Sequence, residues 1–182
     1  MVTLGACLDR YFLLCALTIA TVGAVKDALG RRIPNWLTYN GLIAALLVRI
    51  ALGGWSELRA GLAGMLIAGG IFFLLFLLGG MGGGDVKLMA AVGAWVGLDQ
   101  VGIFLMVSAL AGGLLAAGYM LVHKQVFKTL RNTVELLRHH LTTGIEPHPI
   151  LNVQQAGTLR LPYGVAIAIG TFYCVGNAFW WR

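Results

Sequence analysis

The stretch LLFLLGGMGGGDVKLM, residues 74–89, decides how the chain folds. An apolar run ends in five glycines among six positions, after which Asp85 and Lys87 precede a second apolar run. The whole chain has this character: of 182 residues, 59% are hydrophobic and 11% are charged, and the mean hydropathy is +0.84. In a soluble domain about a quarter of the residues are charged. The sequence therefore predicts an all-α integral membrane protein, folded as a single membrane domain over 1–182.

The stretches between charged residues predict where helices cross the membrane. The fourth such stretch holds eleven residues, between Lys87 and Asp99. A helix of that length covers about 17 Å of a hydrocarbon core about 30 Å thick. We expect about six membrane helices, or four or five if the fourth is re-entrant. Arg49, near the end of the second, is expected to snorkel to the interface. The expected spans are 11–25, 36–52, 60–84, 88–98, 100–122 and 161–181.

The distribution of Lys and Arg predicts the topology. If the N-terminus lies outside, nine of the 13 basic residues fall on the inner side and four on the outer side. This asymmetry predicts both termini outside and the glycine-rich stretch inside. The net charge of +6 is thus interpreted as a topology signal, and we expect no nucleic-acid partner. The long segment at about 123–160 is expected to be a cytoplasmic loop, with an amphipathic helix over 125–141 lying on membrane lipid.

The carboxyl group of Asp85 is expected to lie within the membrane. If Asp99 marks the outer surface, a helix running inward from it reaches Asp85 after about 14 residues, or about 21 Å. An ionisable group at such depth is costly and is interpreted first as functional. The alternative is that Asp85 caps the N-terminus of the fourth helix.

A second carboxyl group, that of Asp27, ends the first span on the same side. A negative charge at a helix C-terminus opposes the helix dipole, so capping does not explain Asp27. An ion pair with Lys26 or Arg31 is the alternative. Two carboxyl groups brought close together cannot both ionise cheaply, so one of them keeps its proton. Such a pair can activate a water and protonate a leaving group.

Four groups of residues together resemble the type IV prepilin leader peptidase family. Gly82-Gly83-Gly84-Asp85 matches the GxGD signature of membrane aspartic proteases. Two further motifs match the family's first aspartate region and the segment that opens its last helix. The resemblance covers essentially the whole chain and is to the short, peptidase-only form of the kind that serves Flp/Tad-type pili. The matching residues are Asp27, IPN at 33–35, GGGDVKL at 82–88 and LPYG at 161–164.

The resemblance implies a GxGD-type aspartic endopeptidase in the bacterial inner membrane, with its active site near the cytoplasmic face. Asp27 and Asp85 would be catalytic. Gly82, Gly84 and Lys87 would lie where the substrate approaches, because glycines let an extended backbone come close. The implied substrates are pilin-like precursors, from which the enzyme would cut a short basic leader.

The bifunctional members of the resembled family also methylate the new N-terminus. They carry an extra cytoplasmic domain after the first span, typically with paired Cys-x-x-Cys elements that bind zinc. Here about eight residues separate Asp27 from the second span, and none is Cys. The chain's three cysteines have no metal-ligand spacing. We expect a peptidase without methyltransferase activity, metal or other cofactor.

Two alternatives belong to other functional classes. Asp27 and Asp85 are also compatible with a small transporter or channel in which they line an ion path. A non-catalytic assembly factor would tolerate Asn at both positions. Two glycine pairs, Gly69-Gly70 and Gly112-Gly113, are expected to serve close helix packing rather than chemistry.

Overall fold

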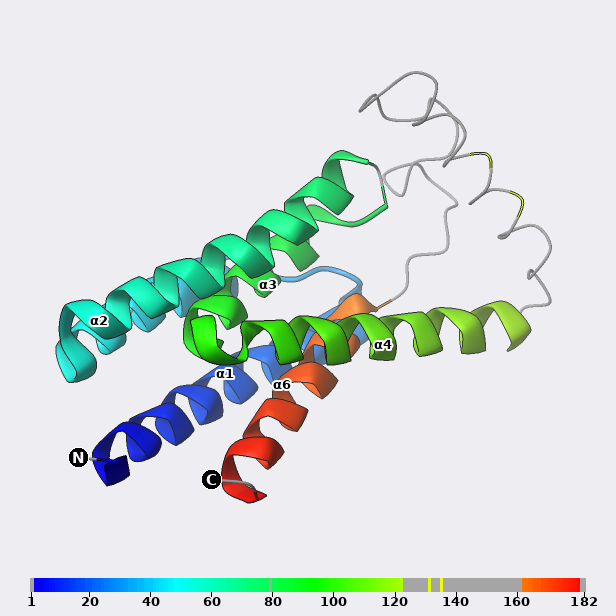
Figure 1. The fold of residues 1–182 in the computed structure, drawn as a ribbon. Coiled ribbons are helices and arrows are strands. Elements are labelled where there is room, and N and C mark those ends of the chain that lie inside the picture. The colour runs from blue at the N-terminus through cyan, green and yellow to red at the C-terminus, as the bar shows by residue number, and fades with distance from the viewer. Residues whose placement is uncertain (1, 79, 123–130, 132–134, 136–161, 181–182) are drawn as a thin grey trace.

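The computed structural model describes residues 2–78, 80–122, 131, 135 and 162–180, and these form an all-helical bundle without strands (Figure 1). The predicted all-α fold is thereby confirmed. Except for Arg131 and Glu135, the segment 123–160 and its expected amphipathic helix lie outside the described residues. The helices are α1 (Val2–Gly30), α2 (Asn35–Leu77), α3 (Gly83–Val96), α4 (Leu98–Val122) and α6 (Tyr163–Trp180).

Four of the described helices are long and apolar enough to cross a membrane: α1 from Cys7, α2, α4 and α6. The chain is therefore a membrane protein, as its composition predicts, but the expected count of six spans is not confirmed. The short fourth span corresponds to α3, which has 14 residues. At 1.5 Å per residue α3 rises about 21 Å, less than the thickness of a hydrocarbon core.

The 43-residue helix α2 folds back on itself. Its backbone leaves helical geometry at Gly54, where φ is 69° and ψ is −158°, a conformation that favours glycine. This break falls between the second and third expected spans. In Figure 1 the bend lies at the far left of the molecule.

Both halves of α2 pack on α3, in opposite directions. In the first half, Asn35 hydrogen-bonds Lys87 and the carbonyl of Gly41 accepts a hydrogen bond from Trp95, so this half runs parallel to α3. The second half runs the other way. A Cβ added to Gly61 would lie 3.1 Å from the Ala94 carbonyl oxygen, and one added to Gly69 would lie 2.9 Å from the Ala90 Cβ. The short helix α3 is thus held by both halves of a helical hairpin.

The remaining helices form the other side of the bundle, with α6 packed on both α1 and α4. A Cβ added to Gly164 would lie 3.2 Å from the Ala24 Cα of α1. Further along α6, a Cβ added to Gly170 would clash with the Ser108 hydroxyl of α4. The lack of side chains at these two positions allows α6 to approach both neighbours.

The two glycine pairs expected to serve packing each divide into one packed and one open residue. Gly69 packs against α3, and Gly112 packs against the ring of Tyr163, which an added Cβ would approach to 2.5 Å. A Cβ added to Gly70 or Gly113 would meet no atom within 4 Å. The expectation holds for the first residue of each pair and is wrong for the second.

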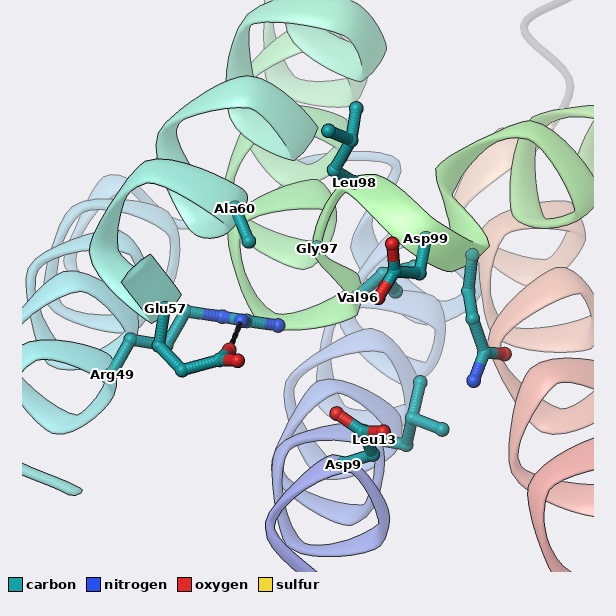
Figure 2. A pocket seen from close by; sticks show the side chains of 10 residues that line it. Asp9, Leu13, Arg49, Glu57, Ala60, Val96, Gly97, Leu98 and Asp99 are labelled. Atoms are coloured by element: carbon teal, nitrogen blue, oxygen red, sulfur yellow. Dashed lines mark hydrogen bonds and ion pairs between the residues drawn. The ribbon is translucent and has the colours of Figure 1, made fainter. Parts of the chain in front are cut away.

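Arg49 does not snorkel, and that expectation is wrong. The side chain is 3% exposed and its guanidinium lies 4.4 Å from the ring centre of Phe12. Arg49 donates hydrogen bonds to the carbonyls of Ala94 (2.8 Å) and Trp95 (2.7 Å) and pairs with the Glu57 carboxylate (Figure 2). Those carbonyls belong to the last turn of α3, where they lack helical partners, so Arg49 supplies the missing donors.

We expect Arg49→Ala to destabilise the fold by about 3 kcal/mol, because it leaves the last carbonyls of α3 and the Glu57 carboxylate without their donor. The measurement is thermal unfolding of the purified protein in detergent. Arg59→Ala is the matched control, since Arg59 also lies in α2 but is exposed. Equal unfolding midpoints for the two variants would contradict a stabilising role for Arg49.

Candidate active site

Asp27 lies in the last turn of α1 and is 7% exposed. Its Oδ2 accepts a hydrogen bond of 2.9 Å from the backbone N–H of Gly164, in the first turn of α6. N–H groups in a first helical turn have no helical acceptor, and the positive end of the helix dipole favours a negative group there. No ion pair joins Asp27 to Lys26 or Arg31 within the described segments. The carboxylate thus has a helix N-terminus as its hydrogen-bonding partner, and the alternative of an ion pair with Lys26 or Arg31 is not observed among the described residues.

Gly164 fits Asp27 closely. A Cβ added at this position would lie 3.1 Å from both the Cβ and the Oδ2 of Asp27. The sequence marks residues 161–164 as a motif but does not reveal this contact. The available signal is the Pro-Tyr-Gly order at 162–164, which is typical of a helix start. Leu161, the first residue of the motif, lies outside the described residues.

Asp85 lies in the first turn of α3 and is partly exposed. The cap position belongs to Gly82, whose backbone lies beside the Asp85 carboxyl group. A Cβ on Gly82 would lie 3.1 Å from the Asp85 Oδ2. Asp85 is therefore not the cap residue of α3. Its negative charge in the first turn favours the helix start, and this role is compatible with a chemical one.

The structure brings Asp27 and Asp85 together. Asp27 lies within electrostatic range of Asp85, and Asp85 lies within range of Tyr163. The helices α1, α3 and α6, which pack on one another, therefore meet at this point. The Asp27–Gly164 hydrogen bond fixes one side of the pair. Because two adjacent carboxyl groups ionise one at a time, the pair can hold one proton and one negative charge.

The other predicted residues surround the start of α3. Lys87 is directed to α2, where its Nζ donates to the Asn35 Oδ1 at 2.9 Å and lies 5.1 Å from the ring centre of Tyr39. A Cβ on Gly84 would lie 3.4 Å from the Cβ of Ile33, an ordinary contact. The Ile33-Pro34-Asn35 segment therefore contacts α3 beside the carboxyl pair, through Ile33 and Asn35.

No group of three or more His, Cys, Asp or Glu side chains suited to a metal ion occurs in the parts of the chain that the structure describes. Cys7, Cys15 and Cys174 are free thiols. The four histidines lie outside these parts. Within the described bundle, the chemistry available at the start of α3 is that of the carboxyl pair.

The fold and this site together define a class of protein: a helical membrane bundle in which two helices each contribute one carboxyl group to a pair. The chain belongs to the type IV leader peptidase family, whose sequence model matches residues 11–117. The match includes Asp27, the 33–35 motif and the glycine-rich segment with Asp85. It does not favour the alternative of a transporter or channel.

Curated relatives are similar over part of their length. The chain is 34% identical over 142 residues to a prepilin leader peptidase/N-methyltransferase of Aeromonas hydrophila, covering 74% of this chain and 43% of the relative. It is 36% identical over 109 residues to the protein of the same name from Burkholderia pseudomallei (strain 1026b), covering 56% of this chain and 34% of that relative. The chain thus spans less than half the length of these relatives. No solved structure matches it.

Proposed function

We propose that this protein is a membrane aspartic endopeptidase that removes the basic leader from type IV pilin-like precursors. The bacterial inner membrane is its proposed location, with both termini outside and the active site near the cytoplasmic face. The observation that carries the proposal is the meeting of Asp27 and Asp85, from α1 and α3, inside a chain of the type IV leader peptidase family.

The proposed reaction uses the two carboxyl groups in complementary protonation states. The ionised group takes a proton from a water, which attacks the carbonyl carbon of the scissile peptide bond. The protonated group supports the developing charge and donates its proton towards the leaving amine. Gly164 orients Asp27 through its backbone N–H hydrogen bond, and Gly82 lies against the Asp85 carboxyl group. The direct test is co-expression with a pilin-like precursor, followed by a gel-shift assay for leader removal.

We further propose that the chain does not transfer methyl groups, although the names of its relatives include that activity. The supporting observation is the short connection between α1 and α2, residues 31–34, which leaves no room for an inserted domain. Ile33 and Asn35, at the end of this connection, contact α3. The proposed enzyme needs neither zinc nor a methyl donor.

Purified enzyme incubated with precursor and S-adenosylmethionine is expected to release a product of unmethylated mass. The rate of cleavage should be the same with and without a zinc chelator, because the proposed chemistry uses carboxyl groups alone. Mass spectrometry of the product checks both expectations. A methylated N-terminus, or cleavage that is lost on chelation, would contradict a metal-free peptidase.

A further inference from the structure

An apolar groove of about 390 Å³ lies between the two halves of α2 and α3. Its walls are mostly aliphatic and aromatic, and a single charged side chain, that of Lys87, lines it. Leu66 and Phe73 both line the groove and lie seven residues apart on one face of α2. The groove therefore extends along α2 for about 10 Å, or two helical turns. The groove therefore fits a short stretch of apolar helix. Its central lining residues are Leu42, Met65, Leu66, Phe73, Val86 and Ala90.

Gly70 keeps the groove open. It lies between Leu66 and Phe73 on the same helix face, and a Cβ added there would meet no atom within 4 Å. The neighbouring Gly69 instead packs against Ala90. Helix packing explains Gly69 but not Gly70, whose missing side chain leaves space for an occupant.

The polar end of the groove lies at the helical turn of α3 that carries Asp85. Lys87 lines the groove, and Asp85 precedes it by two residues, about 200° away around α3. The two sites thus lie on opposite sides of the first turn of α3. Phe76 lies against Gly83 and Ile33 against Gly84, but a Cβ added to Gly82 would meet only the Asp85 carboxyl group, so a peptide can pass closely across Gly82. Crossing a helix about 10 Å wide takes about three extended residues.

We propose that the groove binds the apolar segment of a pilin-like precursor, and that the scissile end of this precursor crosses the glycine turn to reach Asp27 and Asp85. The proposal rests on the proposed peptidase function. The open approach over Gly82 to the Asp85 carboxyl group favours this occupant. A lipid acyl chain fills an apolar groove equally well, but it has no need of a passage from the polar end of the groove to a pair of acids.

The test is photocrosslinking in the Asp85→Asn background, in which the proposed enzyme binds precursor without cutting it. A photoreactive phenylalanine analogue replaces Phe73, which lines the groove and is 49% exposed. The control places the analogue at Phe172 of α6, which is 67% exposed and lies outside the groove. We expect at least tenfold more precursor adduct from position 73. Equal adducts at both positions, or adducts at 73 only with lipid or with a second copy of this chain, would overturn the proposal.

A second measurement uses the open glycine. Gly70→Leu fills the groove and is expected to lower kcat/KM for the precursor at least tenfold, mainly through a higher KM. Gly113→Leu is the matched control, because this exposed position in α4 also faces open space. If the wild type cleaves the precursor but position 73 gives no selective adduct, the groove is not the binding site of the precursor, and the proposed peptidase function still stands. Absence of cleavage by the wild type would overturn both.

Discussion

Asp27→Asn and Asp85→Asn are each expected to reduce leader removal below detection, a loss of at least about a thousandfold. Asn keeps the size of the side chain but can neither accept a proton from water nor donate one as an acid. Because the two groups divide these roles, loss of either one stops the reaction. The measurement is the gel-shift assay with co-expressed precursor, alongside immunoblotting of membranes for each variant.

Asp99→Asn provides the matched control for this experiment. Asp99 lies in the first turn of α4, is exposed, and is near Arg49 and Glu57 at the small polar cavity in Figure 2, apart from the carboxyl pair. This variant should process precursor at the wild-type rate. Substantial processing by either Asp27→Asn or Asp85→Asn would refute the two-carboxyl mechanism.

Gly164→Val is expected to lower kcat by about a hundredfold while the protein still inserts into the membrane. Even a single added carbon would lie 3.1 Å from the Asp27 carboxylate, and the branched side chain of Val must displace it. Misplacing a catalytic group by about 1 Å can cost about a hundredfold in rate. The measurement is single-turnover cleavage of purified precursor.

Gly176→Val controls for the effect of a branched residue in α6. Gly176 is exposed and faces open space, so the added side chain meets no neighbour. Wild-type cleavage by Gly164→Val would show that the Asp27–Gly164 contact does not position the carboxyl group.

The carboxyl pair could be predicted from the sequence because both groups break a local pattern. Asp85 interrupts an apolar stretch directly after glycines, and Asp27 lies at the helix end where its charge is unfavourable. Such signals need no knowledge of distant contacts. The spans around the bend at Gly54 were predictable for the same reason, since the charged residues Glu57 and Arg59 separate two apolar runs.

The residues that hold the site depend on partners far away in the chain, and the sequence does not reveal them. Gly164 donates to a residue 137 positions earlier. Arg49 is expected from the sequence to reach the interface because it lies near the end of a span, yet its acceptors are carbonyls 45 and 46 positions later. Gly69 and Gly70 are identical in the sequence, and only the position of α3 distinguishes their roles.

The arrangement of the connection between α1 and α2 makes it a natural insertion point. α1 packs mainly on α6, and α2 packs mainly on α3, so neither helix depends on the other for its place. Arg31 and Arg32 between them are exposed. Lengthening such a connection costs about 0.6 kcal/mol for each doubling in length. A whole module can therefore be gained or lost at these two residues while the described helices and their carboxyl pair keep the same geometry.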